Sequence, residues 1–187
     1  LISSKDVISW TDNGDHRDGS HLLRLGEHPY YGRCSIYLKF PLREQIKLEE
    51  YSDASVKKAE ILLTPHPNGE QSEGSLLVSV NGVVGYWKEE ELSGYNMPLT
   101  HYLYGSAGAA PTYEHSAGKR LGDFRLDITD LLQEGRQLVE RWLRIPYENN
   151  GICIQPVLFK ESDNQHGTFC SSRTAYPPML ILDVGVN

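Results

Sequence analysis

Apolar and polar residues alternate over many short stretches of this chain. In CSIYLKF, residues 34–40, Cys34, Ile36, Leu38 and Phe40 are apolar positions on one face, and polar or amphipathic residues separate them. This period of two is that of a strand with one buried face. We therefore predict a strand at 34–40. Similar patterns predict strands at 6–10, 21–26, 56–64, 75–80 and 123–128.

Two further stretches are almost wholly apolar. GICIQPVLF (151–159) and MLILDV (179–184) show little alternation. Strands that are covered on both faces have such sequences. We expect both to be central strands.

Turn residues separate these runs. HPNGEQSEG (66–74) predicts a hairpin or a short loop, the pair Asn81-Gly82 predicts a turn, and ENNG (148–151) predicts another. The region 94–121 is rich in Gly, Ala and Ser over 105–118, and we expect it to be a long flexible surface loop because strands flank it.

One helix is predicted at about residues 129–145. Thr129 followed by an acidic residue is typical of a helix start, and Pro146 would end it. The apolar stripe of this helix comprises Leu131, Leu132, Leu138, Val139, Trp142 and Leu143. The chain is thus expected to be all-β: a β-sandwich or jelly roll of two antiparallel sheets with one short helical crossover, in a single domain over residues 1–187.

Composition narrows the classes of function. The formal net charge of −7 argues against a nucleic-acid partner, which attracts basic surfaces. No apolar run approaches the about 20 residues that a membrane-spanning helix needs. The first residue is Leu1 and no signal peptide is visible, so we expect a mature or excised form.

The three cysteines, Cys34, Cys153 and Cys170, form no CxxC pair, which argues against a cysteine-based zinc site. An odd number allows one disulfide and one free thiol, or three buried thiols. The sequence leaves both arrangements open.

The polar stretch TDNGDHRDGS (11–20) offers oxygen ligands from Asp12, Asn13, Asp15 and Asp18. Calcium needs six to eight oxygen ligands, and this spacing is not that of an EF-hand. A polar turn is the favoured interpretation because Asp, Asn and Gly form turns without metal. A structural Ca²⁺ ion bound by these four residues is the alternative.

The order of these motifs resembles the DNRLRE-domain family, which is related to carbohydrate-binding modules. The matching segments are DVISW, HLLRLG, GRCSIYLKFPL (32–42), AEILLT, GYWKEEEL (85–92), FRLDITDLL (124–132), NNGICI (149–154) and FCSSRTAYPPMLILDV (169–184). The chain departs from the family pattern at Pro41, in the long region 94–121 and in the long segment between Thr129 and Asn149. The resemblance implies a β-sandwich that binds carbohydrate.

FRLDITDLL…VERWLRIPYENNGICIQP also resembles the β-sandwich part of transforming-growth-factor-β propeptides. The shared features are a Phe-x-Val-Thr-like start, a Trp-bearing helix and an Asn-x-Gly strand. The mature cystine-knot domain and the long amphipathic N-terminal helix of those precursors are missing here. This resemblance therefore ranks second.

The candidate ligand-binding surface is a basic and aromatic strip on one sheet. Tyr37 and Lys39 are expected on the outward face of strand 34–40, with Arg33 at its start and Arg24 on the strand before. Guanidinium and ammonium groups pair with uronate carboxylates, so this strip would suit an acidic polysaccharide. A solvated sheet face with cross-strand ion pairs is the competing interpretation.

Aromatic side chains could add sugar-stacking platforms to this strip. Trp10 and Tyr31 are the candidates, whereas Trp142 is expected in the core and Trp87 in core or edge packing.

Catalysis has little support. GxSxG, HExxH and phosphate-binding glycine motifs are absent, and three consecutive carboxylates, Glu89 to Glu91, cannot all face one substrate. His101 with Tyr102 or Tyr104 could serve a polysaccharide lyase, but no lyase motif surrounds them.

Three hypotheses follow from the sequence. The first is a non-catalytic carbohydrate-binding module, located outside the cell or at its surface. The second is a structural or adhesion subunit of a surface assembly, which binds other protein chains. The third is a polysaccharide lyase.

Overall fold

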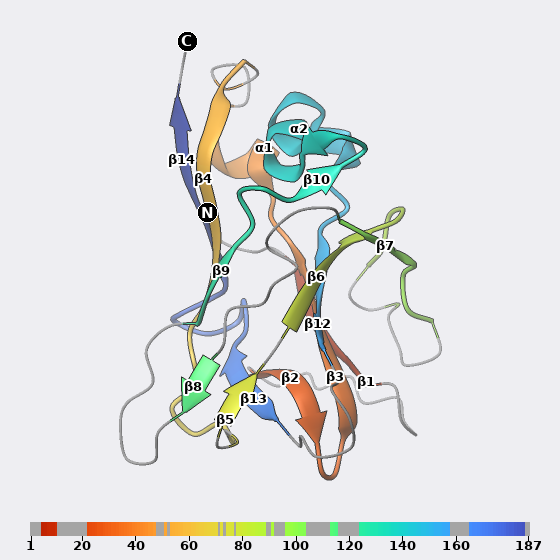
Figure 1. Cartoon of the computed structure of the whole chain (residues 1–187), viewed down its shortest axis with the longest axis vertical. Helices are drawn as coiled ribbons and strands as arrows, with labels where there is room; N and C mark the ends of the chain where they lie inside the picture. Colours follow the sequence, from red (N-terminus) through yellow and green to blue (C-terminus); the bar gives the residue numbers. More distant parts are fainter. Residues whose placement is uncertain are drawn as a thin grey trace.

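The computed structural model describes residues 5–10, 22–47, 51, 53–70, 72, 74–76, 78–88, 91, 96–103, 113–115, 124–157 and 165–185. These residues form antiparallel sheets and little helix, so the prediction of an all-β fold is confirmed (Figure 1). None of the described helices is long and apolar enough to cross a membrane.

The larger sheet has seven strands in the order β13-β2-β3-β12-β6-β7, with β1 also paired to β3. Its bounds are β1 (Lys5–Trp10), β2 (Leu22–His28), β3 (Gly32–Lys39), β6 (Val78–Val83), β7 (Thr100–Tyr102), β12 (Ile152–Pro156) and β13 (His166–Cys170). Ile36 of β3 is opposite Ile8 on one side and Ile154 on the other, which places β3 in the middle of the sheet.

The smaller sheet has three strands in the order β14-β4-β9. They are β4 (Ser55–Leu63), β9 (Phe124–Asp127) and β14 (Met179–Gly185). Ile61 of β4 is opposite both Leu180 and Leu126, and the register with β14 shifts between Asp183 and Val184. Two further two-stranded pairs join β5 (Gly74–Leu76) to β8 (Tyr113–His115), which is distant in sequence, and β10 (Leu132–Gln133) to β11 (Arg136–Gln137), which follows in a hairpin.

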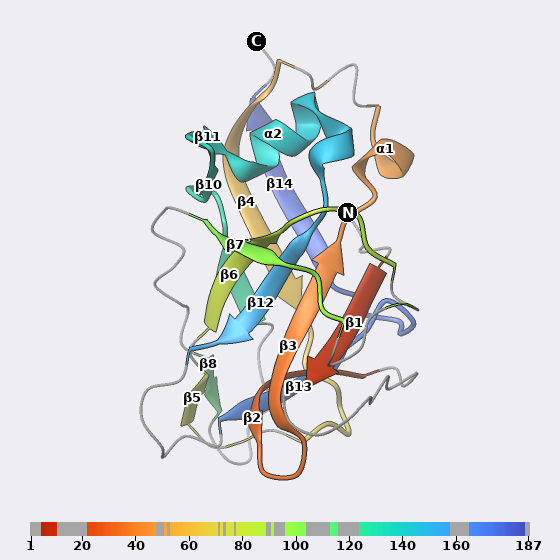
Figure 2. The ribbon, with the colours of Figure 1, turned by 90° about the vertical axis from the view of Figure 1, so that its right-hand side faces the viewer.

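The two larger sheets face each other as layers (Figures 1 and 2). Buried apolar side chains of both sheets form one core cluster between them. Phe124 of the smaller sheet contacts Phe169 of the larger, with ring centroids 5.6 Å apart. The alternation in the sequence explains this core, because every second residue of a strand points to the same side. The largest fully buried side chains include Phe40, Leu25, Ile36, Leu38, Ile61, Leu63, Leu126 and Trp142.

The predicted helix is shorter than expected. Helix α2 (Leu138–Arg144) begins well after Thr129, and it ends before Pro146, as predicted. Glu134 and Gly135 have φ angles of 52° and 76°, which suit the two-residue turn between β10 and β11 and not a helix. Thr129 does not cap a helix. Its hydroxyl accepts a hydrogen bond from the backbone amide of Ala59 at 2.9 Å.

Other expectations about loops also need correction. Asn81 and Gly82 are not a turn, because both lie within β6 and pair with Cys153 and Ile152 of β12. Within the region expected as one long loop, 94–121, lie the short strands β7 and β8. The predicted strand at 75–80 is represented by two strands, β5 and β6. The structure also describes helix α1 (Leu42–Gln45) and the 3₁₀ turn η4 (Pro146–Glu148).

Candidate functional site

The expected basic and aromatic strip is not continuous, because Tyr37 is buried. Its side chain is only 3% exposed and packs with Val83, Trp87 and Cys153, with Met97 partly covering this cluster. The exposure expected for Tyr37 is therefore wrong. The alternation did place Ile36 and Leu38 correctly in the main core, but a second apolar cluster covers the other face of β3. Burial raises the pKa of the Tyr37 hydroxyl far above its ordinary value.

The other members of the expected strip occupy separate contacts. Arg33 donates to the carbonyl of Pro156 at 3.0 Å. Lys39 lies with its Nζ 5.2 Å from the ring centroid of Tyr86, and the Arg24 guanidinium lies 4.6 Å from that of Tyr31. The structure thus brings together Arg24 and Tyr31 but not the whole strip. The ligand-binding roles of these residues stay predictions.

Several predicted site residues lie partly or wholly outside the described part of the chain. Asp12, Asn13, Asp15 and Asp18 belong to the segment 11–20, which is outside it. Only the backbone of Trp10 is described, and it pairs with the backbone of Cys34.

The candidate lyase residues are not assembled into a described site. The ring of His101 occupies the space beside Gly82, and its Nε2 is buried without a hydrogen-bond partner in the described part of the chain. Tyr104, Glu89 and Glu90 lie outside the described residues, and exposed Glu91 pairs with Lys88 at 2.8 Å.

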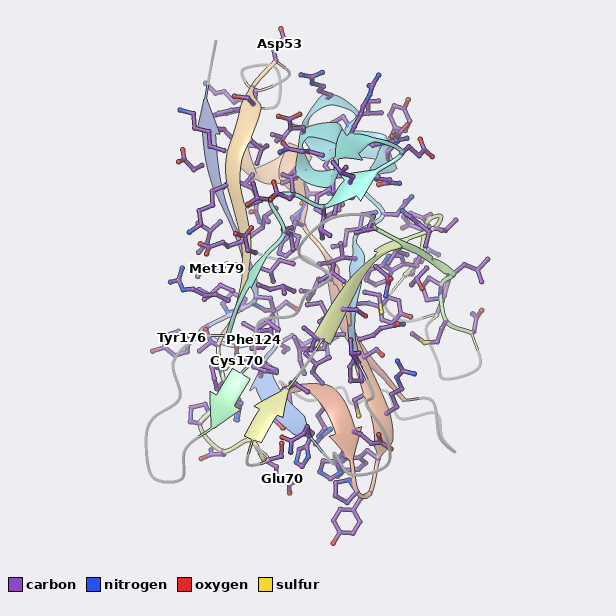
Figure 3. The ribbon with its side chains drawn as sticks, in the orientation of Figure 1. Asp53, Glu70, Phe124, Cys170, Tyr176 and Met179 are labelled. Carbon is purple, nitrogen blue, oxygen red and sulfur yellow. The ribbon has the colours of Figure 1, made fainter. Side chains whose placement is uncertain are left out.

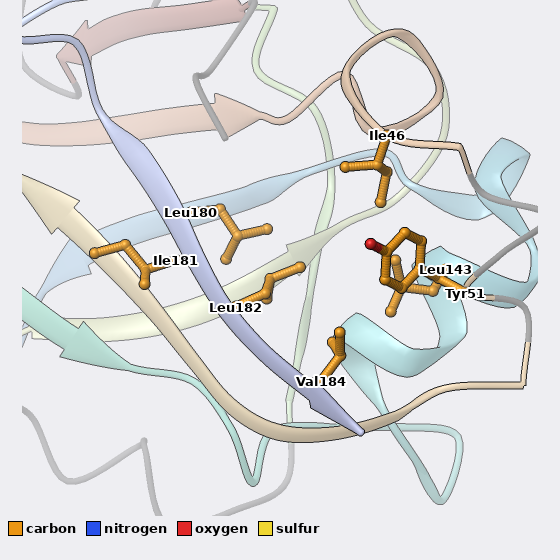
Figure 4. A pocket seen from close by; sticks show the side chains of 7 residues that line it. All are labelled: Ile46, Tyr51, Leu143, Leu180, Ile181, Leu182 and Val184. Carbon is orange, nitrogen blue, oxygen red and sulfur yellow. The ribbon is translucent and has the colours of Figure 1, made fainter. Parts of the chain in front are cut away.

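An apolar groove of about 340 Å³ lies beside β14 (Figure 4). Its walls come from the segments that follow α1 and from α2 and β14: the lining residues are Ile46, Tyr51, Leu143, Leu180, Ile181, Leu182 and Val184. Four of these, Ile46, Tyr51, Leu182 and Val184, are only partly buried and pack against the main core. The groove is therefore an opening onto the core at the side of the smaller sheet.

Strand β14 has the sequence of a covered strand but a different position. Within the described residues, β14 pairs with β4 on one side and with no strand on the other. The expectation of a central strand is met by β12, which lies between β3 and β6, but not by β14. Ile181 is 37% exposed on one face, and Leu182 and Val184 are half-buried on the other.

A polar cluster lies at the opposite end of the molecule, where Glu70 is labelled in Figure 3. His28 is buried, and its Nδ1 accepts a hydrogen bond from the backbone amide of Tyr30 at 3.1 Å. This contact leaves the proton on Nε2, which donates to the Glu70 carboxylate at 2.7 Å. The hydrogen bond from His28 is the main reason why the pKa of Glu70 lies below its ordinary value.

The ring of His166 completes this cluster, with its centroid 4.5 Å from that of His28. Sequence reasoning missed the cluster because its members come from β2, from the segment after β4 and from β13. No short motif links such distant positions, and β13 itself was not predicted. Only the fold brings them together.

The three cysteines are free thiols in this structure, and all are buried. Of the arrangements that the sequence left open, this agrees with three buried thiols. Desolvation raises the pKa of Cys153 to about 12, so this thiol has little thiolate character at neutral pH.

The described residues therefore define an antiparallel β-sandwich with short helical segments, of which α2 is the longest. No protein-family model matches the chain. A tryptophan–tRNA ligase from Listeria innocua serovar 6a is 29% identical over 115 residues, which cover 61% of this chain and 34% of that protein. The chain thus spans about a third of the length of this curated relative, and the match does not show a shared family.

Proposed function

We propose that this chain is a non-catalytic binding domain whose ligand is an extended segment of another protein, docked along β14 and over the apolar groove. One observation carries the proposal: β14 has apolar residues on both faces, as a covered strand has, but lies at the edge of the described sheet. Exposed apolar edge strands pair readily with other chains.

The geometry of β14 suits this mode of binding. Leu180, Leu182 and Val184 project into the groove, because alternate residues of a strand share a face. A segment lying alongside β14 would place its own alternate side chains over the same groove. Main-chain hydrogen bonds then supply affinity, and the groove selects the side chains.

The register between β14 and β4 shifts between Asp183 and Val184, with Lys57 of β4 as the extra residue, and this irregularity limits the regular stretch that is available for pairing. Bulges at sheet edges interrupt regular hydrogen bonding. Apolar contacts in the groove would therefore supply much of the binding free energy. We expect a preferred partner to carry two or three apolar residues at alternate positions.

The resemblance to transforming-growth-factor-β propeptides is consistent with a protein ligand. The Trp-bearing helix of that resemblance corresponds to α2, where Trp142 is buried in the core. Leu143, the next residue, lines the groove. The segment that carries the resemblance thus forms one wall of the proposed binding site.

A random peptide library displayed on phage, selected against the wild-type chain, tests the proposal. The test variant is Ile181→Lys, because lysine on an edge strand opposes pairing and this partly exposed side chain can be replaced without entering the core. The matched control is Val84→Lys, another β-branched residue, 49% exposed and lying just beyond β6. Circular dichroism checks that both variants fold.

The expected result is a family of peptides with alternating apolar residues that bind the wild type and Val84→Lys. Their affinity for Ile181→Lys should fall at least about tenfold, which corresponds to 1.4 kcal/mol. Failure to enrich any peptide, or equal binding to Ile181→Lys, would exclude β14 as the docking site.

Carbohydrate binding at the cell surface or outside the cell is the second candidate function. The observation that favours it is the pair of Lys39 and Tyr86, since this tyrosine is 67% exposed and has an ammonium group over its ring. A sugar ring could stack on Tyr86 while a uronate carboxylate pairs with Lys39. Lys39 belongs to the expected strip, and the exposed Tyr86 is the aromatic residue of this site in place of the buried Tyr37.

Affinity electrophoresis through a gel that contains alginate, a polyuronate, tests this candidate. The double variant Tyr86→Ala, Lys39→Gln should migrate without retardation if the pair binds the polymer. Tyr147→Ala is the control, because this tyrosine is also exposed, at 76%, but lies in η4. Equal migration of wild type and double variant would argue against this site.

A further inference from the structure

Three side chains with metal-ligating atoms converge where β2, β13 and the segment after β4 meet. His28 ends β2, His166 begins β13, and Glu70 follows β4. One ligand atom from each lies within 4.8 Å of the other two. We propose that His28, Glu70 and His166 bind one divalent transition-metal ion of the zinc type.

The backbone around these residues is already tied together. The backbone amide of Glu27 donates a hydrogen bond to the carbonyl of Gln165 at 2.9 Å. The backbone amide of Ser72 donates one to the carbonyl of His166, also at 2.9 Å. The Ser72 hydroxyl in turn accepts the amide of His166 at 2.8 Å. His28 thus follows a residue that bonds to the β13 segment, His166 bonds to Ser72 itself, and Glu70 lies two residues before Ser72. Such a scaffold limits the movement needed to close a metal site.

The ligand types select the class of metal. Two imidazoles and one carboxylate form a set that zinc accepts, with nitrogen and oxygen ligands at about 2.0–2.2 Å. Calcium needs six to eight oxygens and is a poor match. The Glu70 side chain is 72% exposed, so solvent can supply a fourth ligand. This site uses no cysteine and none of the four residues considered above for calcium.

Metal binding requires a change of tautomer at His28. The amide of Tyr30 donates to Nδ1, so the proton of the neutral ring is on Nε2 and points at Glu70. A metal bound at Nε2 takes the place of this proton, and the neutral ring then carries its proton on Nδ1. The Tyr30 amide loses its acceptor. The Nδ1 proton and the Tyr30 amide would then be two donors facing each other, so the turn that carries the exposed Tyr30 has to shift when the metal binds.

The test is titration of the metal-free full chain with Zn²⁺, with competition against a chromophoric chelator to measure stoichiometry and affinity. Glu70→Gln and His166→Gln are the main variants, because neither side chain is fully buried, whereas replacing His28 could prevent folding. His66→Gln is the matched control: this nearby histidine accepts the amide of Asn68 and is outside the three-residue cluster. ¹⁵N NMR follows the amide of Tyr30 and the ring nitrogens of His28.

We expect one Zn²⁺ per chain, at least about tenfold weaker binding in Glu70→Gln and in His166→Gln, and unchanged binding in His66→Gln. Zn²⁺ should move the His28 proton from Nε2 to Nδ1 and shift the Tyr30 amide signal, while excess Ca²⁺ should not displace it. Absence of stoichiometric binding, binding that survives in both main variants, or an unshifted His28 would overturn the proposal.

Discussion

Tyr37 and Trp87 pack edge to face on the outer side of the larger sheet, with ring centroids 6.2 Å apart and planes at 71°. The indole N–H of Trp87 also donates to the carbonyl of Asn150 at 2.7 Å, which fixes the ring over β3 and β12. The outer face of the sheet thus has an apolar cluster of its own. The sequence suggested that this face of β3 binds a ligand, but at its centre the face is covered by packed apolar side chains.

Replacing Trp87 by alanine should lower the free energy of unfolding by about 3–5 kcal/mol, because it opens a cavity over Tyr37 and leaves the Asn150 carbonyl without its donor. Urea unfolding measures this change. The neighbouring substitution Tyr86→Ala removes an aromatic ring that is 67% exposed, so it should cost less than about 1 kcal/mol. Similar losses for the two variants would contradict the packing described here.

Gly151 and Gly135 provide a matched pair of glycine substitutions. Both have positive φ angles, 87° and 76°, which side-chain-bearing residues rarely adopt. A Cβ atom at Gly151 would lie 2.2 Å from the carbonyl oxygen of Leu38, whereas one at Gly135 would meet nothing within 4 Å. Gly151→Ala should therefore disturb the start of β12 in addition to its backbone strain.

We predict a loss of about 1–2 kcal/mol for Gly135→Ala and a clearly larger loss, more than about 3 kcal/mol, for Gly151→Ala. Thermal and urea unfolding of both variants measure the difference. Equal losses would show that the backbone angle alone, and not the contact with Leu38, determines the cost.

The strands of the core were predictable because their signal is local. In β3 and β4, apolar residues at every second position define the buried face without knowledge of the partner strand. Strands β7 and β8 have three residues each, which is too few for such a pattern, and β13, with the sequence HGTFC, lacks a regular apolar alternation. Their pairing depends on neighbours that are distant in sequence, so it could not be read from the segments themselves.

Tyr37 shows why the candidate binding strip failed. Alternation predicts which residues share a face, and it correctly placed Tyr37 on the face opposite Ile36. It cannot predict what covers that face. Trp87 comes from the distant segment after β6, and an amphipathic tyrosine is compatible with both burial and exposure.

The start of α2 was mispredicted for a local reason. Thr129 and the residues after it resemble a helix N-terminus, but Glu134-Gly135 supplies the positive φ angles of a tight hairpin turn. Thr129 instead bonds to Ala59 and to Asp127. The pairing of β10 with β11 and the contacts with β4 therefore outweigh the local preference of Thr129 for a helix N-terminus.

The cysteines should be unreactive in the native protein. Cys34, Cys153 and Cys170 are buried thiols, and desolvation raises the pKa of the last two. We expect little reaction with a thiol reagent such as DTNB at neutral pH and three equivalents after denaturation, because the thiolate is the reactive form. Mass spectrometry of alkylated protein with and without prior reduction should give the same mass. A mass difference that corresponds to one disulfide would contradict the assignment of all three cysteines as thiols.

Asp127 should contribute to the acid sensitivity of the fold. The hydroxyl and the amide of Thr129 both donate to its carboxylate, at 2.6 and 2.9 Å, and these bonds lower the pKa of Asp127 below its ordinary value of 3.8. A group whose pKa is lower in the folded state stabilises the fold above its unfolded pKa. That stabilisation disappears as the pH falls through the folded pKa. Because the side chain is exposed, we expect a contribution below about 1 kcal/mol.

Asp127→Asn tests this contribution, because the amide keeps an oxygen acceptor but has no charge to lose. The variant should be slightly less stable than the wild type at pH 7, and the difference should vanish at a pH well below 3.8, where the wild-type carboxylate is protonated. Thr129→Ser retains the hydroxyl donor and should keep the wild-type pH dependence. Urea unfolding at several pH values measures all three proteins. A stability difference between Asp127→Asn and wild type that does not change with pH would show that the Thr129 hydrogen bonds do not favour the charged form of Asp127.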